Sequence, residues 1–405
     1  MIKTLVVTVP YKKDSTGGAA KSFLNIFNGL KENNLLQLKI LELKTNKMIS
    51  RFLNPLGVGY FVFIPKILKT INKFKPNIII TQSRISFSAI FSASIKKIPI
   101  INIVRDNSDA CPKNIDIISY GKACPGLKNK KTCYSCINNW STLRVLIGNK
   151  SPGWEYSLSS YFSTIIYKIR YFACQINISL RKKATVNLVA SELMEKILSN
   201  NIDSKKIKIA NITPIKNISS VESLEKKEQL LFVIPNYNAS HKGLDFILKL
   251  SQIIPKNYKI LIVGNKLSEK QLASGKQLNI INLGQISPEE LNRLYKESKI
   301  TLVPSFYNEA FGRIIIESLV NKTPVISSPN CGANSFFIEK DFLKIVPLKL
   351  SLWLEAINNM IKKSHKITDY DIKEIYNQFS IPQSIDDISK LIKQILKKRN
   401  EERHL

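Results

Sequence analysis

In the first half of the chain, short runs of branched apolar residues alternate with longer segments whose apolar positions repeat with a helical period. Such runs predict strands, and such segments predict helices. We expect strands at residues 3–10, 36–43, 77–83, 98–106 and 206–214, helices at 17–34 and 63–76, and a strand running into a helix over 184–201. Alternation of this kind favours a parallel sheet with helices on both faces.

The second half repeats this alternation after a polar, turn-rich linker at residues 215–229. Strands are expected at 230–238, 258–264, 279–286, 300–305 and 323–328, with helices at 242–254, 287–299 and 312–320. A chain of 405 residues also exceeds the size of a single core. We therefore predict an α/β protein with two doubly wound, Rossmann-like domains facing a cleft, residues 1–212 and 213–383. An amphipathic helix over 384–405 is expected to pack back toward the first domain.

The charge balance is strongly basic, with 61 Lys and Arg against 30 Asp and Glu and a net charge of +31. Residues 1–200 carry 30 basic and 9 acidic side chains, whereas residues 201–405 carry 31 and 21. The first half is therefore expected to meet the more acidic partner, such as an anionic membrane surface, an anionic polymer or nucleic acid. A coding bias toward Lys, Ile and Asn explains the same composition without any binding role.

No run approaches the ~20 apolar residues that span a bilayer, and the first apolar stretch is too short for a signal peptide. We expect a cytoplasmic protein, peripheral at the inner face of the cell membrane. Its six cysteines are then reduced thiols or metal ligands rather than disulfides.

Regular alternation breaks between about residues 107 and 171, in an insertion rich in Cys, Asn and Lys. The insertion contains Cys111, Cys124, Cys133 and Cys136, of which the last two form a Cys-x2-Cys pair. Four thiolates suit a structural zinc site if the chain folds the first two back onto the pair. Four reduced thiols that pack the insertion fit the same spacing.

Two glutamates stand eight positions apart in the stretch NEAFGRIIIESLV, residues 308–320. Glu309 precedes the glycine at the head of the predicted helix, and Glu317 lies within the helix. Ligands of open α/β sheets bind at the carboxyl ends of strands, where helix N-termini offer N–H groups to phosphate. A nucleotide-sugar needs contacts at two separated groups of hydroxyls, with a diphosphate between them. The two acids fit that need, although paired acids are also common on ordinary helix surfaces.

Residues 281–333 resemble the donor-binding half of retaining glycosyltransferases of family 4, which have the two-domain GT-B fold. The resemblance rests on the Glu-x7-Glu signature at Glu309 and Glu317, with Pro304-Ser305 before it and residues 323–326, Thr-Pro-Val-Ile, after it. It extends to residues 242–250 and, with less specific motifs, to the Gly-Gly turn at 17–18 and to residues 186–201. It therefore covers most of the chain.

The resemblance implies a role for three charged side chains. Glu309 would lie beside the donor sugar, and Glu317 would bind the ribose. Lys242 matches the family lysine that neutralises the diphosphate leaving group, where a fixed cation stabilises the growing negative charge. Without the resemblance, Lys242 would be one of many solvated lysines.

Backbone groups complete the implied donor site. N–H groups around Ala310, Phe311 and Gly312 would meet the diphosphate or the sugar hydroxyls. The turn at Gly17 and Gly18 would reach the donor phosphates from the facing domain. Taken alone, this turn is as well explained by an ordinary connection between a strand and a helix.

Two positions depart from the family pattern. The arginine that usually stands five residues before the lysine is Tyr237 here, so either Arg313 or Lys12 supplies the second cation, or the phosphate is bound more weakly than is typical of the family. The histidine that opens the insertion in some members is replaced by Arg105. Asp106 follows at the end of a strand, where it would orient the acceptor hydroxyl or, as the alternative, simply form a turn.

We therefore expect an enzyme that moves a sugar from a UDP- or GDP-sugar to a glycan or lipid-linked acceptor, with retention of anomeric configuration. It would be a hexosyltransferase of bacterial surface-polysaccharide synthesis, and the resemblance implies no metal ion in catalysis. One alternative is a basic nucleic-acid-binding protein with a zinc module, although scattered lysines argue against nucleic acid as a partner. The other is a sugar-nucleotide epimerase on the same fold, which normally needs more histidines and carboxylates.

Overall fold

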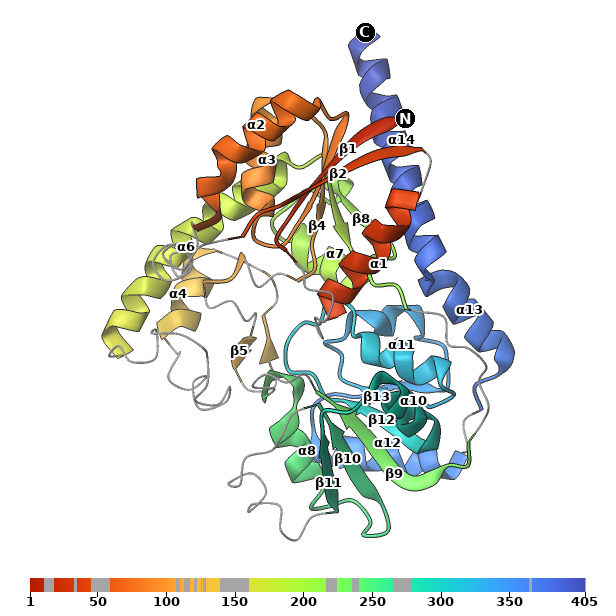
Figure 1. The fold of residues 1–405 in the computed structure, drawn as a ribbon. Coiled ribbons are helices and arrows are strands. Elements are labelled where there is room, and N and C mark those ends of the chain that lie inside the picture. Colours follow the sequence, from red (N-terminus) through yellow and green to blue (C-terminus); the bar gives the residue numbers. More distant parts are fainter. Residues whose placement is uncertain are drawn as a thin grey trace.

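The computed structural model describes residues 1–10, 18–32, 35–44, 59–106, 110–112, 117–119, 122–124, 126, 129–138, 160–215, 224–234, 240–264, 279–363 and 366–404. These residues form two six-stranded parallel sheets, each with helices packed on it, one above the other in Figure 1. The predicted α/β architecture of two doubly wound domains is confirmed.

The N-terminal sheet has the strand order β2-β1-β3-β4-β7-β8. Every residue of β3, β4 and β7 is buried, because these inner strands have helices on both faces. All six strands overlap the runs that predict them. They are β1 (Ile2–Thr8), β2 (Leu36–Glu42), β3 (Ile78–Gln82), β4 (Ile100–Ile103), β7 (Val186–Val189) and β8 (Ile207–Ile209).

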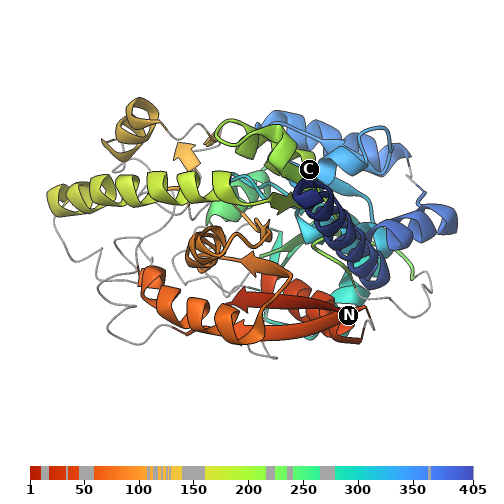
Figure 2. The same ribbon diagram turned by 90° about the horizontal axis from the view of Figure 1, so that it is seen from above.

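Helices cover both faces of this sheet. Along β1, Val6 packs into a cluster with α1, whereas Leu5 and Val7 pack with α2 and α3, as the alternation of side chains along a strand requires. Figure 2 shows α2, α3 and α6 together, apart from α14. The helical segments are α1 (Gly18–Glu32), η2 (Gly59–Phe63), α2 (Ile64–Phe74), α3 (Ser86–Ile95), α6 (Ser160–Lys183), α7 (Glu192–Ser199) and η5 (Ser204–Lys206).

The described part of the insertion contains more regular structure than its sequence indicates. A small antiparallel pair, β5 (Ile117–Ser119) and β6 (Lys122–Ala123), precedes α4 (Lys130–Asn138), which packs on α6. Helix α6 begins at Ser160, so the irregular part of the stretch 107–171 is shorter than expected. The helical period of α6 is hidden because its buried face includes Arg170, Asn177 and Arg181.

The C-terminal sheet has the order β11-β10-β9-β12-β13-β14. Its chain runs outward from β9 in one direction as far as β11 and then returns to β12 on the other side of β9, so the strand order reverses between β9 and β12. The strands are β9 (Lys227–Val233), β10 (Lys259–Val263), β11 (Ile280–Gly284), β12 (Ser298–Val303), β13 (Val325–Ser327) and β14 (Leu343–Ile345).

Three C-terminal elements, β14, α12 and α13, have no counterpart in the sequence prediction. Helix α13 begins with a capping box, in which Thr368 and Asp371 bond to each other's backbone N–H groups. The helical segments of this part are η6 (Ser240–Lys242), α8 (Leu244–Leu250), α10 (Pro288–Glu297), α11 (Arg313–Val320), η7 (Gly332–Phe336), α12 (Leu350–Lys363), α13 (Asp369–Phe379) and α14 (Ile381–His404). Within the described ranges, no helix is both long enough and apolar enough to cross a bilayer.

Helices α13 and α14 connect the two sheets. Helix α13 packs on α11 of the C-terminal domain, whereas α14 runs back along α1 of the N-terminal domain (Figure 1). The contact with α1 is close, because a side chain at Gly29 would collide with Ile385. At the junction, Phe379 packs edge-on to Phe311 and Phe336, with ring centroids 5.2 and 5.1 Å away. One hydrophobic cluster therefore includes residues of both domains.

Replacing Phe379 with Ala should lower the free energy of unfolding by about 3–5 kcal/mol, because the ring is buried and its loss leaves a cavity at the domain junction. Tyr370→Ala on the same helix is the matched control, since Tyr370 is 69% exposed, and it should change stability by less than about 0.5 kcal/mol. Chemical denaturation followed by circular dichroism measures both. Equal effects would show that the Phe379 ring is not packed in this cluster.

Candidate active site

The loop between β12 and α11 is fixed by backbone hydrogen bonds to the loop that follows β13. The N–H of Glu309 donates to the carbonyl of Asn330 at 2.8 Å, and the N–H of Gly332 donates to the carbonyl of Glu309 at 3.0 Å. The next bond, from Ala333 N–H to the Phe311 carbonyl, is 2.6 Å long. The backbone at Glu309 is thereby held at the carboxyl edge of the C-terminal sheet.

Two glycines in the left-handed region shape this edge. Gly312 has a φ of +90° and caps α11, which begins at Arg313 and directs its first N–H groups toward the loop. Gly243 has a φ of +94° and caps α8, and a Cβ there would collide with the Pro304 carbonyl. Gly243 therefore lets the segment after β9 approach the loop after β12.

This approach brings Lys242 against Glu309. The Lys242 Nζ lies 2.6 Å from Glu309 Oε1 and 3.0 Å from the Tyr307 hydroxyl oxygen. The side chains of Lys242 and Glu309 are only 16% and 7% exposed. Burial alone would lower the pKa of Lys242, but Glu309 and Tyr307 outweigh it and raise that pKa. Lys242 is therefore a fixed, desolvated cation.

Tyr307 lies at the centre of this group. Burial, together with the charge of Glu309, raises the pKa of the Tyr307 hydroxyl to about 12, although Lys242 acts in the opposite direction. Asp106 adds to the increase, so its carboxylate stands within electrostatic reach of Tyr307. The structure therefore brings together Lys242, Glu309 and Tyr307, and the negative charge of Asp106 acts on this group from the other domain.

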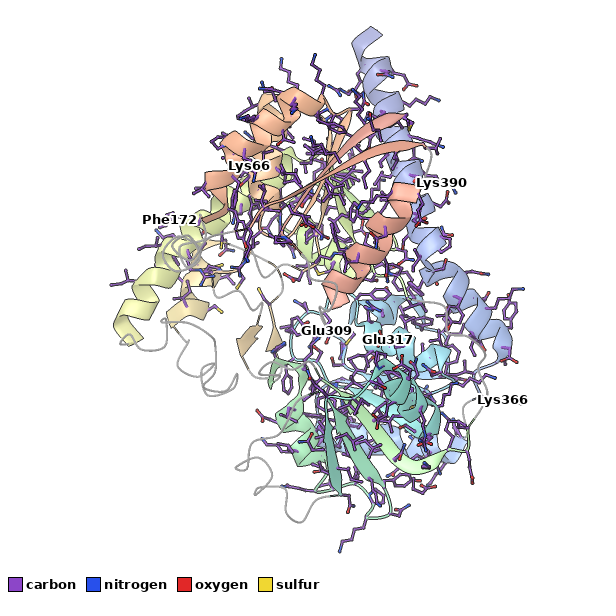
Figure 3. All side chains as sticks on the ribbon, viewed as in Figure 1. Lys66, Phe172, Glu309, Glu317, Lys366 and Lys390 are labelled. Atoms are coloured by element: carbon purple, nitrogen blue, oxygen red, sulfur yellow. The ribbon has the colours of Figure 1, made fainter. Side chains whose placement is uncertain are left out.

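The ion pair between Lys242 and Glu309 lies where doubly wound folds usually bind ligands. Lys242 follows β9 and Glu309 follows β12, the two strands between which the strand order reverses. At such a reversal the connecting loops diverge to opposite faces of the sheet, leaving the strand ends open to a ligand. Figure 3 shows Glu309 at the edge of the C-terminal domain that faces the N-terminal one.

The N-terminal sheet presents its own polar group at its carboxyl edge. Arg105, at the end of β4, donates from Nε to Gln82 Oε1 at 3.0 Å and from Nη1 to the Ile212 carbonyl. Gln82 in turn donates to the Thr8 hydroxyl oxygen at 3.4 Å. Arg105 thus links the ends of β3 and β4 in the domain that carries Asp106.

Glu317 lies on α11, beside Glu309 in Figure 3, and is less buried, with 31% of its side chain exposed. It forms an ion pair with Arg313 at 3.2 Å. Burial and the negative charge of Glu317 raise the pKa of Tyr295 well above its usual value. Arg313 also reaches Ser22 of α1 at 3.5 Å, so the first turns of α1 approach the start of α11.

Of the other residues predicted at the donor site, the structure describes Gly18. It begins α1, one turn before Ser22, the residue that Arg313 contacts. Gly17, Lys12 and Tyr237 lie outside the described residues.

The four cysteines of the insertion do not form a metal site in the part of the chain that the structure describes, where no three His, Cys, Asp or Glu side chains are grouped as ligands. Cys111 and Cys133 are buried, and Cys124 and Cys136 are partly buried. Cys124 contributes to the candidate site through its backbone, because its carbonyl accepts a 2.6 Å hydrogen bond from Asn308 Nδ2.

A second hydrogen bond from the N-terminal domain reaches the same loop. The Ser191 hydroxyl donates to the Ala310 carbonyl at 2.7 Å and also caps α7 by accepting from the Met194 N–H. A Cβ at Gly332 would overlap both Ser191 and the Ala310 carbonyl, so only glycine fits there. Contacts on both sides of Glu309 therefore come from the facing domain.

Comparison with known proteins agrees with this geometry. Residues 215–371 match the family described as "Glycosyl transferases group 1". A curated relative from Haemophilus influenzae, named an uncharacterized glycosyltransferase, is 27% identical over 205 residues, which are 46% of this chain and 56% of the relative. The chain spans about half the length of the curated relatives it matches. These matches support a glycosyltransferase.

Solved structures show the fold. Sucrose-phosphate synthase from Thermosynechococcus elongatus superimposes with a TM-score of 0.66 at 12% identity, covering 98% of this chain and 100% of that one. HepE of Anabaena, solved in complex with UDP and glucose, gives a TM-score of 0.61 at 12% identity, covering 97% and 100%. The two-domain architecture is the GT-B fold.

Sequence reasoning missed three residues of the site, Tyr307, Asn308 and Ser191. The first two stand directly before Glu309, and their nearness along the chain is the signal that could have found them. Ser191 stands directly before a helix, and that position indicates an N-cap residue. The hydrogen bond from Ser191 to Ala310, 119 residues away, has no signal in the sequence.

Ser191→Ala should speed amide hydrogen exchange in residues 309–313 about fivefold, because one hydrogen bond worth about 1 kcal/mol no longer ties the loop to the N-terminal domain. Ser287→Ala is the matched control, since Ser287 caps α10 by accepting from the Glu290 N–H. Both variants lose an N-cap, but only Ser191→Ala should affect the loop. Unchanged exchange in residues 309–313 would contradict the positioning role of Ser191.

Proposed function

We propose that this protein is a retaining glycosyltransferase of family 4 that transfers a hexose from a UDP- or GDP-sugar. The single observation that carries the proposal is the buried Lys242–Glu309 pair at the reversal between β9 and β12. A desolvated lysine beside a carboxylate matches what a nucleotide-sugar requires, namely a cation for the diphosphate and an acceptor of hydrogen bonds for the sugar.

The donor would lie along the carboxyl edge of the C-terminal sheet. Lys242 neutralises the diphosphate, and the N–H groups at Phe311 and Gly312 bond the phosphate or sugar oxygens. Glu309 contacts the donor sugar, and Glu317 binds the ribose hydroxyls. Arg313 provides the second cation in place of the family arginine, an assignment supported by its position at the first turn of α11.

The acceptor would approach from the N-terminal domain, where Asp106 orients the attacking hydroxyl. The acceptor oxygen forms a bond to the anomeric carbon on the face from which the diphosphate leaves, so the configuration is retained. The bond between the anomeric carbon and the diphosphate oxygen breaks, and the acceptor proton passes to the departing phosphate. Negative charge grows on that phosphate in the transition state, where Lys242 stabilises it most.

The charge of the N-terminal half supports the location that we propose for the acceptor. We infer a glycan or lipid-linked acceptor of bacterial surface-polysaccharide synthesis, met at the cytoplasmic face of the membrane. The excess of lysine and arginine over acidic residues in residues 1–200 supports attraction to an anionic lipid surface.

Donor binding should be tested first, by thermal shift with UDP-sugars, GDP-sugars and oligonucleotides. Either class of sugar nucleotide should raise the melting temperature, because a ligand that binds only the folded state stabilises it by mass action. Stabilisation by oligonucleotide alone would overturn the transferase and favour a nucleic-acid-binding protein. Conversion of the donor to its epimer without an acceptor would identify an epimerase instead.

Glu309→Gln and Lys242→Ala should each lower kcat by at least about 100-fold, the scale of a lost transition-state charge contact. Glu317→Gln should instead raise KM for the donor with little change in kcat, because ribose binding contributes equally to the ground and transition states. Steady-state transfer rates, with the product anomer assigned by NMR, measure these effects.

Each single change also leaves one buried charge without its partner, so stability needs its own control. The double variant Lys242→Met/Glu309→Gln removes both charges and should be more stable than either single variant, while remaining inactive. Lys249→Ala and Glu289→Gln, at exposed positions of the same domain, should keep normal rates. Normal rates in Glu309→Gln and Lys242→Ala would show that the active site lies elsewhere.

A further inference from the structure

The outer side of α6 is apolar where a surface helix is normally polar. Among the residues between Ile165 and Ile176 whose exposure is described, the exposed positions follow the spacing i, i+4, i+7 and i+11, which is one stripe of a helix. These four side chains are Ile165, Ile169, Phe172 and Ile176, exposed by 39%, 48%, 58% and 52%. Figure 3 shows Phe172 on α6, at the margin of the molecule.

The inner side of the same helix is partly polar. Arg170, Asn177 and Arg181 are buried against the protein, with exposed fractions of 4%, 3% and 2%. These polar groups point inward beside buried apolar residues such as Ala173, Cys174 and Ile178, while the four apolar side chains of the stripe point outward. Because exposed apolar area is unfavourable in water, the stripe indicates an apolar partner on the outer side of α6.

The charges on α6 and on the helices packed around it are of one sign. Helices α2, α3, α4 and α6 contain no Asp or Glu, and they pack on one another in sequence, α2 on α3, α3 on α6 and α4 on α6. Two of these helices, α4 and α6, carry exposed lysines. They are Lys130 and Lys131 on α4, and Lys182 and Lys183 in the last turn of α6.

Helix α3, which packs on α6, also exposes apolar side chains. It exposes Phe91 and Ile95, by 37% and 52%, and is followed at once by the exposed Lys96 and Lys97. Aliphatic and aromatic side chains bordered by lysine are typical of helices that lie in the interface of a membrane, where lysine meets anionic headgroups.

We propose that the α6 stripe, Ile165, Ile169, Phe172 and Ile176, docks the protein on the surface of an anionic lipid bilayer. The stripe enters the boundary between headgroups and acyl chains, and the lysines of α4 and α6 bind the headgroups. A second copy of the chain fits this face poorly, because two acid-free, lysine-bearing surfaces repel each other. The docking proposal rests on the proposed function in one respect, because the proposed function places the acceptor at the same lipid surface.

Vesicle flotation without any sugar nucleotide tests the proposal. The protein should float with vesicles of phosphatidylcholine mixed with phosphatidylglycerol, and much less with phosphatidylcholine alone. Phe172→Gln/Ile176→Gln should weaken binding at least about tenfold, because two large apolar side chains leave the lipid. Lys182→Glu/Lys183→Glu should weaken binding to the mixed vesicles about fivefold for each lysine removed.

Ile338→Gln/Tyr370→Gln is the matched control, since these side chains are 68% and 69% exposed on the C-terminal domain. It should float like the wild-type protein. All replaced side chains are exposed, so melting temperatures should stay unchanged; if the double variant misfolds, Phe172→Gln alone carries the test.

The proposal is overturned if the wild-type protein does not float with the mixed vesicles. It is overturned too if Phe172→Gln/Ile176→Gln floats as well as the control Ile338→Gln/Tyr370→Gln. It is also overturned if sedimentation velocity reveals a dimer that Phe172→Gln/Ile176→Gln dissociates while vesicle binding is absent. The flotation experiment contains no sugar nucleotide, and the thermal-shift experiment contains no lipid. A negative result in one experiment therefore does not contradict the proposal that the other experiment tests.

Discussion

The ion pair between Lys242 and Glu309 is the constraint on which the arrangement of the C-terminal domain depends. Two charges with little exposure are costly to remove from water, and that cost is offset only if the partners are held in good geometry. The chain meets this requirement with a left-handed glycine after Lys242, with backbone bonds on both sides of Glu309 and with the Tyr307 hydroxyl as a further partner. These features hold the ion pair at the carboxyl ends of the strands and not within the hydrophobic core.

Two kinds of contact join the domains, and they differ in strength. At α13 and α14 the contact is apolar, because residues of both domains share one hydrophobic cluster. Beside the candidate site it includes hydrogen bonds from Asn308 to the Cys124 carbonyl and from Ser191 to the Ala310 carbonyl, together with the packing of Ala310 on the Met194 cluster. Exposing the larger apolar cluster costs more free energy than separating these few groups. The contact at the helices is therefore the stronger of the two.

Periodicity was enough to predict every strand of the two sheets except β14, because parallel strands buried on both faces have nearly continuous branched apolar sequences. The short strand β14 exposes two of its three residues and lacks that signal. Periodicity also failed for α3, whose serines hide its apolar face, and for α6, where Arg170, Asn177 and Arg181 are buried. In the site, residues that share a loop with Glu309 could have been found from the sequence. Ser191 could not, because its role depends on how two domains meet, and Asp106 was chosen by resemblance rather than by any pattern.

The return of α14 to α1 has a consequence for how the protein is made. Helix α1 belongs to the part of the chain synthesised first, yet its outer side, at Gly29, is covered by Ile385. While residues 381–404 are still on the ribosome, the N-terminal sheet has strands and inner helices but lacks this cover. Domains generally fold as units in the order of synthesis. Here the outer side of α1 can be covered only after α14 has been released, so the last surface of the first domain is buried after the second domain has been synthesised.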